Sequence, residues 1–311
     1  MNYFLINLSQ KILKIIKFLI SLFFTSTTKH ELIFYQSGFF RVPDNVDTIY
    51  ITACAGGGSG GSLYNVAGGL RACGGGGSGA YCVNYPLKVI PGSEISIIVG
   101  AGGIAPTTSN GGSNGGNTYI ENIALRGGRG GKSDSDGRGG GNGGFVWNFP
   151  ESPGGTAGHD GSDGGFLFNK STYYHYNYLK YLRDTLFFTY CFPGAGGGGG
   201  DSYVTTQGKG GRCGDPSSYD LPSTPTSGDY PGGEIWQYAM SGGGGASSPW
   251  GKGGKGSGFN SNGNLVPPEN GSGYGSGGGG AAIPAGSTWG YSQKGGNGAP
   301  GFVYIKYYQP I

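Results

Sequence analysis

Runs of glycine separate the strand-like segments of this chain, and they restrict its possible folds more than any other feature. The sequence contains 73 glycines among 311 residues, many of them in blocks. The longest blocks are residues 56–58, 74–77, 196–200, 242–245 and 277–280. Ordering a residue costs roughly 1–2 kcal/mol, and glycine loses the most backbone freedom. The chain is therefore either disordered or held by dense hydrogen bonding between its glycine blocks.

Composition favours the ordered alternative. Disordered chains are typically rich in charge and poor in aromatic residues, whereas 14% of this chain is aromatic and 12% is charged. The five cysteines match no zinc-binding spacing, and Cys54 and Cys82 fall in strand-like segments as small apolar residues. We therefore expect an ordered chain without a zinc site.

Positive charge is concentrated before residue 30. Four lysines, Lys11, Lys14, Lys17 and Lys29, precede the first acid, Glu31. The rest of the chain carries 20 − 4 = 16 basic side chains against 17 acidic ones, although the formal net charge is +3. A surface that binds nucleic acid needs a basic excess. We therefore expect no specific nucleic-acid partner.

Residues 1–28 differ from the rest and form the first of two expected units. Two lysines interrupt their apolar segment, and the unbroken run 18–24 is far shorter than the roughly 20 residues that cross a bilayer. Four interpretations fit: a secretory signal, a helix lying on a membrane surface, a helix that docks to a fibre or another partner, and an ordinary terminal helix. Residues 29–311 form the second unit, a single glycine-rich domain.

Strand patterns lie in the first third of the chain and at its end. Alternation predicts strands over residues 47–55 and 302–308. A strong strand at a C-terminus frays unless it joins a sheet, so we expect these two to pair. Such pairing would anchor both ends of the glycine-rich region in one small β base.

Two turn signals predict antiparallel hairpins. A Pro-Gly pair separates residues 80–90 from 94–100, and a tighter turn separates 118–120 from 123–125. A different segment, residues 166–192, is rich in tyrosine and almost free of glycine. Helix and strand fit this insert equally well.

Packing of extended glycine segments would supply the hydrogen bonds that the composition demands. An extended chain with three residues per turn forms no internal hydrogen bonds, but neighbouring chains can satisfy each other when only glycine lines the contacts. The sequence therefore predicts an all-β fold: a small antiparallel β base at the chain ends carries a bundle of packed polyglycine II helices with protruding loops.

Three stretches give the chain a family resemblance. They are Val42-Pro43-Asp44-Asn45-Val46 with the strand that runs into Gly56, Pro91-Gly92 with the run to Gly103, and Gly295 to Val303. In this order, across roughly residues 39–308, they resemble glycine-rich domains of bacteriophage tail-fibre tip adhesins. The resemblance implies a β base, a polyglycine bundle and variable tip loops that bind the host surface. Similar domains also occur in other viral and protist surface proteins.

Motifs for catalysis, cofactors or metals are not convincing in this chain. Residues 130–133 end like a phosphate-binding loop, but Arg126 stands where the first glycine is required. The pair His159-Asp160 has no nucleophile at a recognisable elbow. Aspartates in the glycine-rich turns lack the tandem spacing of calcium-binding repeats. We therefore predict no enzyme activity, no cofactor and no metal.

Aromatic side chains beside the glycine blocks are the candidates for ligand binding, because a flat ring with a polar group suits contact with a sugar or a protein. These residues also suit packing against the bundle. The candidates are Trp147, Trp236, Trp250, Trp289, Tyr274 and Tyr291.

These observations predict a structural and recognition protein of a virion or cell surface. Its loops, at the end remote from the two termini, would bind a host-surface glycan or protein. The alternative is a flexible glycine-rich protein that associates with RNA or belongs to a matrix; an arginine–glycine stretch over residues 126–131 fits that alternative.

Overall fold

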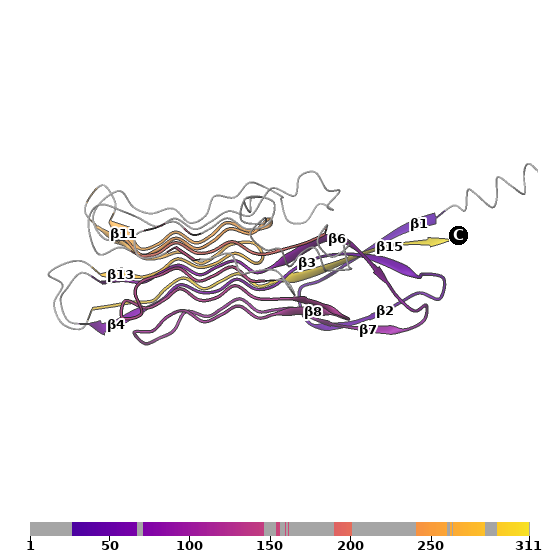
Figure 1. The fold of residues 1–311 in the computed structure, drawn as a ribbon, viewed down its shortest axis with the longest axis horizontal. Helices are drawn as coiled ribbons and strands as arrows, with labels where there is room; N and C mark the ends of the chain where they lie inside the picture. The colour runs from indigo at the N-terminus through magenta and orange to yellow at the C-terminus, as the bar shows by residue number, and fades with distance from the viewer. Residues whose placement is uncertain are drawn as a thin grey trace, which may run out of the picture.

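The protein is elongated, with its larger sheets at one end and glycine-rich segments running along the long axis (Figure 1). The computed structural model describes residues 27–66, 71–145, 154–155, 159, 161, 190–200, 241–259, 262, 264–283 and 291–310. Strands β2, β3, β7 and β15 mark the sheet end, and β4, β11 and β13 mark the far end. Among the described residues, no helix is both long and apolar enough to cross a membrane.

A five-stranded antiparallel sheet joins the two ends of the described chain. Its strands, in order across the sheet, are β1 (Thr27–Phe34), β15 (Phe302–Pro310), β3 (Thr48–Cys54), β6 (Tyr81–Lys88) and β10 (Cys191–Phe192). Ile305 of β15 lies opposite Leu32 on one side and Ile51 on the other. The predicted pairing of the C-terminal strand with residues 47–55 is therefore confirmed. Strand β1, for which the sequence carried no prediction, covers the other side of β15.

A second antiparallel sheet packs against the first. Its order is β2 (Gly38–Arg41), β7 (Glu94–Ile98), β8 (Thr118–Ile120) and β9 (Ile123–Leu125). Ile97 and Ile120 of this sheet and Ile51 and Ile305 of the other belong to one core and are at most 1% exposed. The predicted tight hairpin β8–β9 is confirmed, and Glu121 in its turn has φ 49°.

The predicted hairpin between residues 80–90 and 94–100 is wrong. Both segments are strands, but β6 pairs with β3 and β10, whereas β7 pairs with β2 and β8. Val42 holds the turn between them, since its N–H donates to Ser93 O (2.8 Å) and its carbonyl accepts from Gly92 N–H (3.1 Å). Gly92 has φ 74°, which glycine adopts without strain. The turn therefore carries the chain from one sheet to the other.

A bulge in β6 changes which side chains face the core between the sheets. The pairing with β3 shifts between Ile51 and Ala53, so that β6 has one more residue there than its partner. Asn84 has φ 55°, and its N–H donates to Thr52 Oγ1 at 3.0 Å. Cys82 and Tyr85 consequently lie in the same core cluster.

Short strand pairs close the far end of the molecule. They are β4 (Leu63–Val66) with β14 (Tyr291–Gln293), β5 (Arg71–Ala72) with β13 (Ala282–Ile283), and β11 (Gly258–Phe259) with β12 (Leu265–Val266). The aromatic insert 166–192 lies outside the described residues except for 190–192, of which the last two form β10.

Glycine segments between the two ends bond to one another through their backbones. In segment 73–80, Gly74 N–H donates to Lys132 O (3.0 Å), and three residues later Gly77 N–H donates to Arg129 O (2.9 Å). The residues between them donate to other segments. In all, segment 73–80 exchanges backbone hydrogen bonds with 55–61, 126–132, 141–144, 195–198, 243–246 and 275–281. This segment is thus surrounded by backbone on all sides.

Such close neighbours leave no room for side chains. A Cβ built on Gly76 would overlap the carbonyl oxygen of Gly58, and the same holds for a Cβ on Gly58 against Arg129 O. Because the obstructing atoms belong to the backbone, no rotation can remove the overlap. Only glycine fits at these positions, because the neighbouring backbones approach so closely.

Gly76→Ala is expected to lower the free energy of unfolding by about 3 kcal/mol or more, the upper part of the range for overpacking. The matched control is Gly38→Ala in β2, where a Cβ would meet Phe34 at 3.8 Å, an ordinary contact. The control is expected to cost less than about 0.5 kcal/mol. Urea denaturation measures both, and equal losses would contradict the packing described here.

Candidate recognition surface

Trp250, one of the aromatic residues expected to bind a ligand, is buried. It is 1% exposed, and its ring meets Phe302 and Tyr81 edge-on at centroid distances of 5.0 and 5.6 Å. Both partners begin strands of the five-stranded sheet, so Trp250 lies where that sheet passes into the glycine segments. A ligand cannot reach this ring, and we correct the expectation: Trp250 is a packing residue.

Tyr274 also lies towards the sheet end. Its ring stacks on Tyr35 (5.5 Å between centroids, 17° between planes) and packs against Phe302. Burial, followed by the neighbouring Tyr35, raises the pKa of the Tyr274 hydroxyl. Tyr35, which is 48% exposed, leaves one side of this pair open to solvent. The structure thus places Tyr274 at the opposite end from the loops expected to bind a ligand.

Tyr291 is at the far end, as expected for a tip residue. It begins β14 opposite Val66 of β4. Its partly buried ring packs against a small apolar cluster that includes Leu63 and Ile283. The structure therefore brings Tyr291, but not Trp250 or Tyr274, to the far end.

Trp147, Trp236 and Trp289 lie outside the described residues. Their described neighbours in the chain show where each stretch is attached. Trp289 precedes β14 at the far end by two residues, whereas Trp147 follows Phe145, whose ring lies under the Arg126 guanidinium near the sheet end.

The stretch that contains Trp236 is attached to the far end on both sides. It follows Gly200, whose N–H donates to Arg138 O at 2.8 Å in a far-end turn. It precedes Gly242, whose N–H donates to Ser257 O at 2.8 Å, next to β11. The described residues on both sides of 201–240 therefore lie at the far end.

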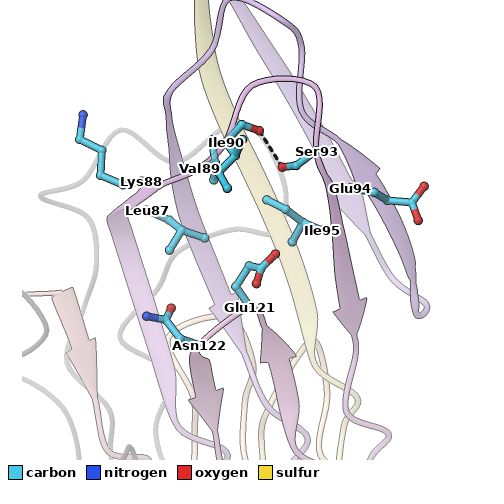
Figure 2. Close-up of a pocket in the computed structure, with 9 residues that line it drawn as sticks. All are labelled: Leu87, Lys88, Val89, Ile90, Ser93, Glu94, Ile95, Glu121 and Asn122. Carbon is cyan, nitrogen blue, oxygen red and sulfur yellow. Dashed lines mark hydrogen bonds between the residues drawn. The ribbon is translucent and has the colours of Figure 1, made fainter.

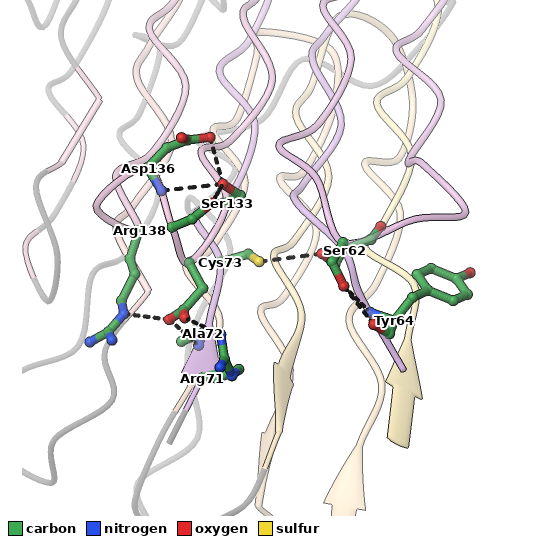
Figure 3. Close-up of polar contacts among 11 residues, drawn as sticks. Ser62, Tyr64, Arg71, Ala72, Cys73, Ser133, Asp136 and Arg138 are labelled. Carbon is green, nitrogen blue, oxygen red and sulfur yellow. Dashed lines mark hydrogen bonds and ion pairs between the residues drawn. The ribbon is translucent and has the colours of Figure 1, made fainter. Parts of the chain in front are cut away.

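A charged cluster that the sequence analysis missed ties two far-end elements together. Asp134 accepts from Arg138 Nε (2.6 Å) and Arg71 Nη1 (3.2 Å), and more weakly from the Ala72 N–H (3.4 Å). Figure 3 shows Arg71 of β5 and Arg138 of the turn reaching this point from separate segments. The i,i+4 spacing of Asp134 and Arg138 was the one available signal in the sequence.

The turn that carries this cluster has its own internal bonds. Ser133 donates its hydroxyl to Asp136 Oδ2 at 2.5 Å (Figure 3). The Asp136 and Arg138 N–H groups both donate to the Ser133 carbonyl. Gly137 and Arg138 have φ 86° and 59°. A tight turn of this kind presents its polar groups at the surface.

Cys73 lies just inside the far end. Its S–H donates to Ser62 O at 3.7 Å (Figure 3). Burial raises the pKa of the Cys73 thiol to about 12. At neutral pH this thiol therefore stays protonated and reacts poorly.

A hollow of about 350 Å³ lies at the sheet end, between the turns that follow β6 and β8 (Figure 2). Leu87 and Ile95 form apolar walls, and the Glu121 carboxylate lies between them, whereas Glu94 points away. The hydroxyl of Ser93 donates to Ile90 O at 2.6 Å and so bonds the turn itself. The hollow is therefore a surface depression lined by apolar side chains and one carboxylate.

The histidine that the sequence analysis weighed for catalysis has a backbone role in the structure. The His159 carbonyl accepts from Gly199 N–H at 3.0 Å, and Asp160 lies outside the described residues. Among the residues that the structure describes, no group of three or more His, Cys, Asp or Glu side chains converges as metal ligands would.

Comparison with known proteins adds one finding. A family model described as a glycine-rich domain matches residues 36–308. A search of curated proteins finds no match. The matched range includes both larger sheets, the glycine segments and the far-end strands described above.

Asp134→Ala is expected to lower the free energy of unfolding by about 1–2 kcal/mol, since it leaves the partly buried groups of the far-end cluster without their acceptor. The ion pairs themselves add little, because Arg71 is 42% exposed. Glu94→Ala in β7 is the control, expected to cost less than about 0.5 kcal/mol because this residue is exposed. Denaturation and the amide exchange rate of Ala72 measure the difference; equal effects would refute a specific role for Asp134.

Proposed function

The chain belongs to the glycine-rich domain family, and on this premise we propose that its glycine segments are packed polyglycine II helices that form a rigid support for recognition loops. The protein would then be a non-enzymatic structural and recognition component of a virion or cell surface. Its ligand would be a glycan or protein on the host surface.

The observation that carries the proposal is the three-residue period of the hydrogen bonds. Gly58 and Gly61 donate to segment 73–80, while the two residues between them donate elsewhere, Ser59 to Ser113 O and Gly60 to Gly296 O. A polyglycine II helix has three residues per turn and no internal hydrogen bonds, so successive residues address three different neighbours. This pattern is what such helices would produce when packed side by side.

Rigidity and the position of the ends support a display function. Thr27 and Pro310 pair at the sheet end, so both described ends of the chain lie on the same side of the bundle. The described residues that flank 201–240 and 284–290 lie at the opposite end, and these two stretches contain Trp236 and Trp289. A bundle of glycine segments whose two chain ends lie at the base would hold these loops away from the surface to which the base is attached.

The resemblance to tail-fibre tip adhesins supports the same function, because there the tip loops of a polyglycine bundle bind the host. Tryptophan and tyrosine rings suit sugars and protein surfaces alike. Residues 1–28, the last two of which begin β1, would attach the base to a fibre or to a membrane surface. Of the six aromatic candidates, we retain Trp236, Trp289 and Tyr291 for the recognition surface.

Amide hydrogen exchange separates this proposal from that of a flexible RNA-associated or matrix protein. Packed helices protect backbone amides, and we expect slow exchange throughout residues 74–77, 196–200 and 242–245. In a flexible chain the amides of the glycines, which are 73 of the 311 residues here, would exchange fast everywhere. Residue-resolved NMR makes the measurement, and uniformly fast exchange in these blocks would remove the proposed bundle.

Binding is expected to depend on the far-end tryptophans. The double variant Trp236→Ala, Trp289→Ala should lower binding by about tenfold or more, as loss of aromatic anchors does at other interfaces. Tyr308→Ala is the control: this ring is 43% exposed but lies at the sheet end. Glycan arrays and fluorescence binding to whole cells provide the readout, with near-ultraviolet circular dichroism as a check of folding. Retained binding in the double variant, or its loss in the control, would contradict a far-end site.

A further inference from the structure

We propose that Cys82 and Cys191 form a redox site at the edge of the five-stranded sheet, closing to a cross-strand disulfide by exchange with a small-molecule disulfide such as oxidised glutathione. The structure holds both residues as thiols. The inference concerns the sheet end and does not depend on the recognition surface.

The register of two strands places these cysteines opposite each other. In the antiparallel pair β10–β6, Cys191 lies across from Cys82 and Phe192 across from Tyr81. Directly opposed residues share a face of the sheet, with Cα atoms about 4.5 or 5.5 Å apart. Disulfides span Cα distances of about 4.4–6.8 Å, so the pair needs no large backbone movement to close.

Packing around the pair is compatible with a disulfide. Both side chains are 0% exposed and belong to the same core cluster. The next residue across the sheet is Ala53, which is small and leaves space beside Cys82. Cys82 S–H donates weakly to Ile51 O at 3.8 Å, a bond that an S–S link would replace at little cost.

The remaining described cysteines are placed where they cannot substitute for either partner. Cys54 lies opposite Tyr81, in the cluster on the other face of the sheet. Cys73 belongs to the far-end cluster and stays protonated at neutral pH, as shown above. Among the cysteines that the structure describes, Cys191 is therefore the one that faces Cys82.

Access to the buried pair follows from the position of β10. This strand has two residues and lies at the edge of the sheet, so it can leave without opening the pairing of β6 with β3. Short edge elements open locally at low free-energy cost. During folding, or after such an opening, both thiols reach solvent.

Exchange then proceeds in two balanced steps. One cysteine thiolate attacks a sulfur of oxidised glutathione, which breaks the glutathione S–S bond, forms a mixed disulfide and releases one reduced glutathione. The second cysteine thiolate attacks the protein sulfur of the mixed disulfide and releases the second glutathione. In total, two protein thiols are oxidised to one disulfide, and one glutathione disulfide is reduced to two thiols.

The test uses the full chain, first reduced with dithiothreitol and then refolded with oxidised glutathione. Thiol titration in denaturant should give five thiols for the reduced protein and three after oxidation, since 5 − 2 = 3. Peptide mapping by mass spectrometry without reductant should show one cross-linked pair that contains Cys82 and Cys191. Five remaining thiols, or a link to any other cysteine, would overturn the proposal.

Two variants make the assignment specific. Cys54→Ser removes a buried cysteine from the same sheet and should still lose two thiols on oxidation, from four to two. Cys82→Ser should keep at least three of its four thiols, since Cys191 then has no cysteine opposite it and can lose its thiol only to a mixed disulfide with glutathione. Two thiols lost by Cys82→Ser would show that another pair is oxidised and would contradict the assignment, while the wild-type peptide map decides the question even if a variant folds poorly.

Discussion

Backbone hydrogen bonds between glycine segments are the interaction on which the rest of this structure depends. Segment 73–80 has no large side chain, and yet its amides and carbonyls find partners in six surrounding segments. A buried backbone group without a partner costs about 1–3 kcal/mol, so each segment is stable only when its neighbours are present. The arrangement therefore forms as a whole, and side chains cannot enter it because neighbouring backbones occupy the space where a Cβ would lie.

The sheet end supplies what the glycine segments lack, namely an apolar core that sets register. Strand β3 is followed directly by a glycine segment, and β6 and β15 each directly follow one. The pairing of Ile305 with Ile51 therefore also determines which amides meet further along. Trp250, packed between Tyr81 and Phe302, covers the transition between side-chain packing and backbone packing. The opposed cysteines of β6 and β10 lie in the same region, where a covalent link would hold the short edge strand in place.

The segments between the two ends of the molecule carry few side chains, because neighbouring backbones occupy the space where a Cβ would lie. The far-end cluster around Asp134 and the ring of Tyr291 show that larger and charged residues enter where the glycine segments stop. A recognition function located at the far end agrees with this division. Proposals for the base, in contrast, concern attachment and redox chemistry, since both described chain ends and the cysteine pair are found there.

Local patterns in the sequence were sufficient to predict the strands over residues 47–55 and 302–308 and the tight turn at Glu121. Alternation and turn chemistry act over only a few residues, so they can be recognised without the rest of the fold. For an ordered chain, glycine content was sufficient to require hydrogen bonding between segments, because an isolated glycine run cannot satisfy its own backbone. Tertiary structure decided which sheet β7 joins, that Trp250 is buried, and that Cys82 faces Cys191. Each of these three features depends on residues more than 50 positions apart in the sequence or on the hydrogen bonds between Val42 and the turn before β7. Such choices arise from the packing free energy of the whole fold, which no short stretch of sequence contains.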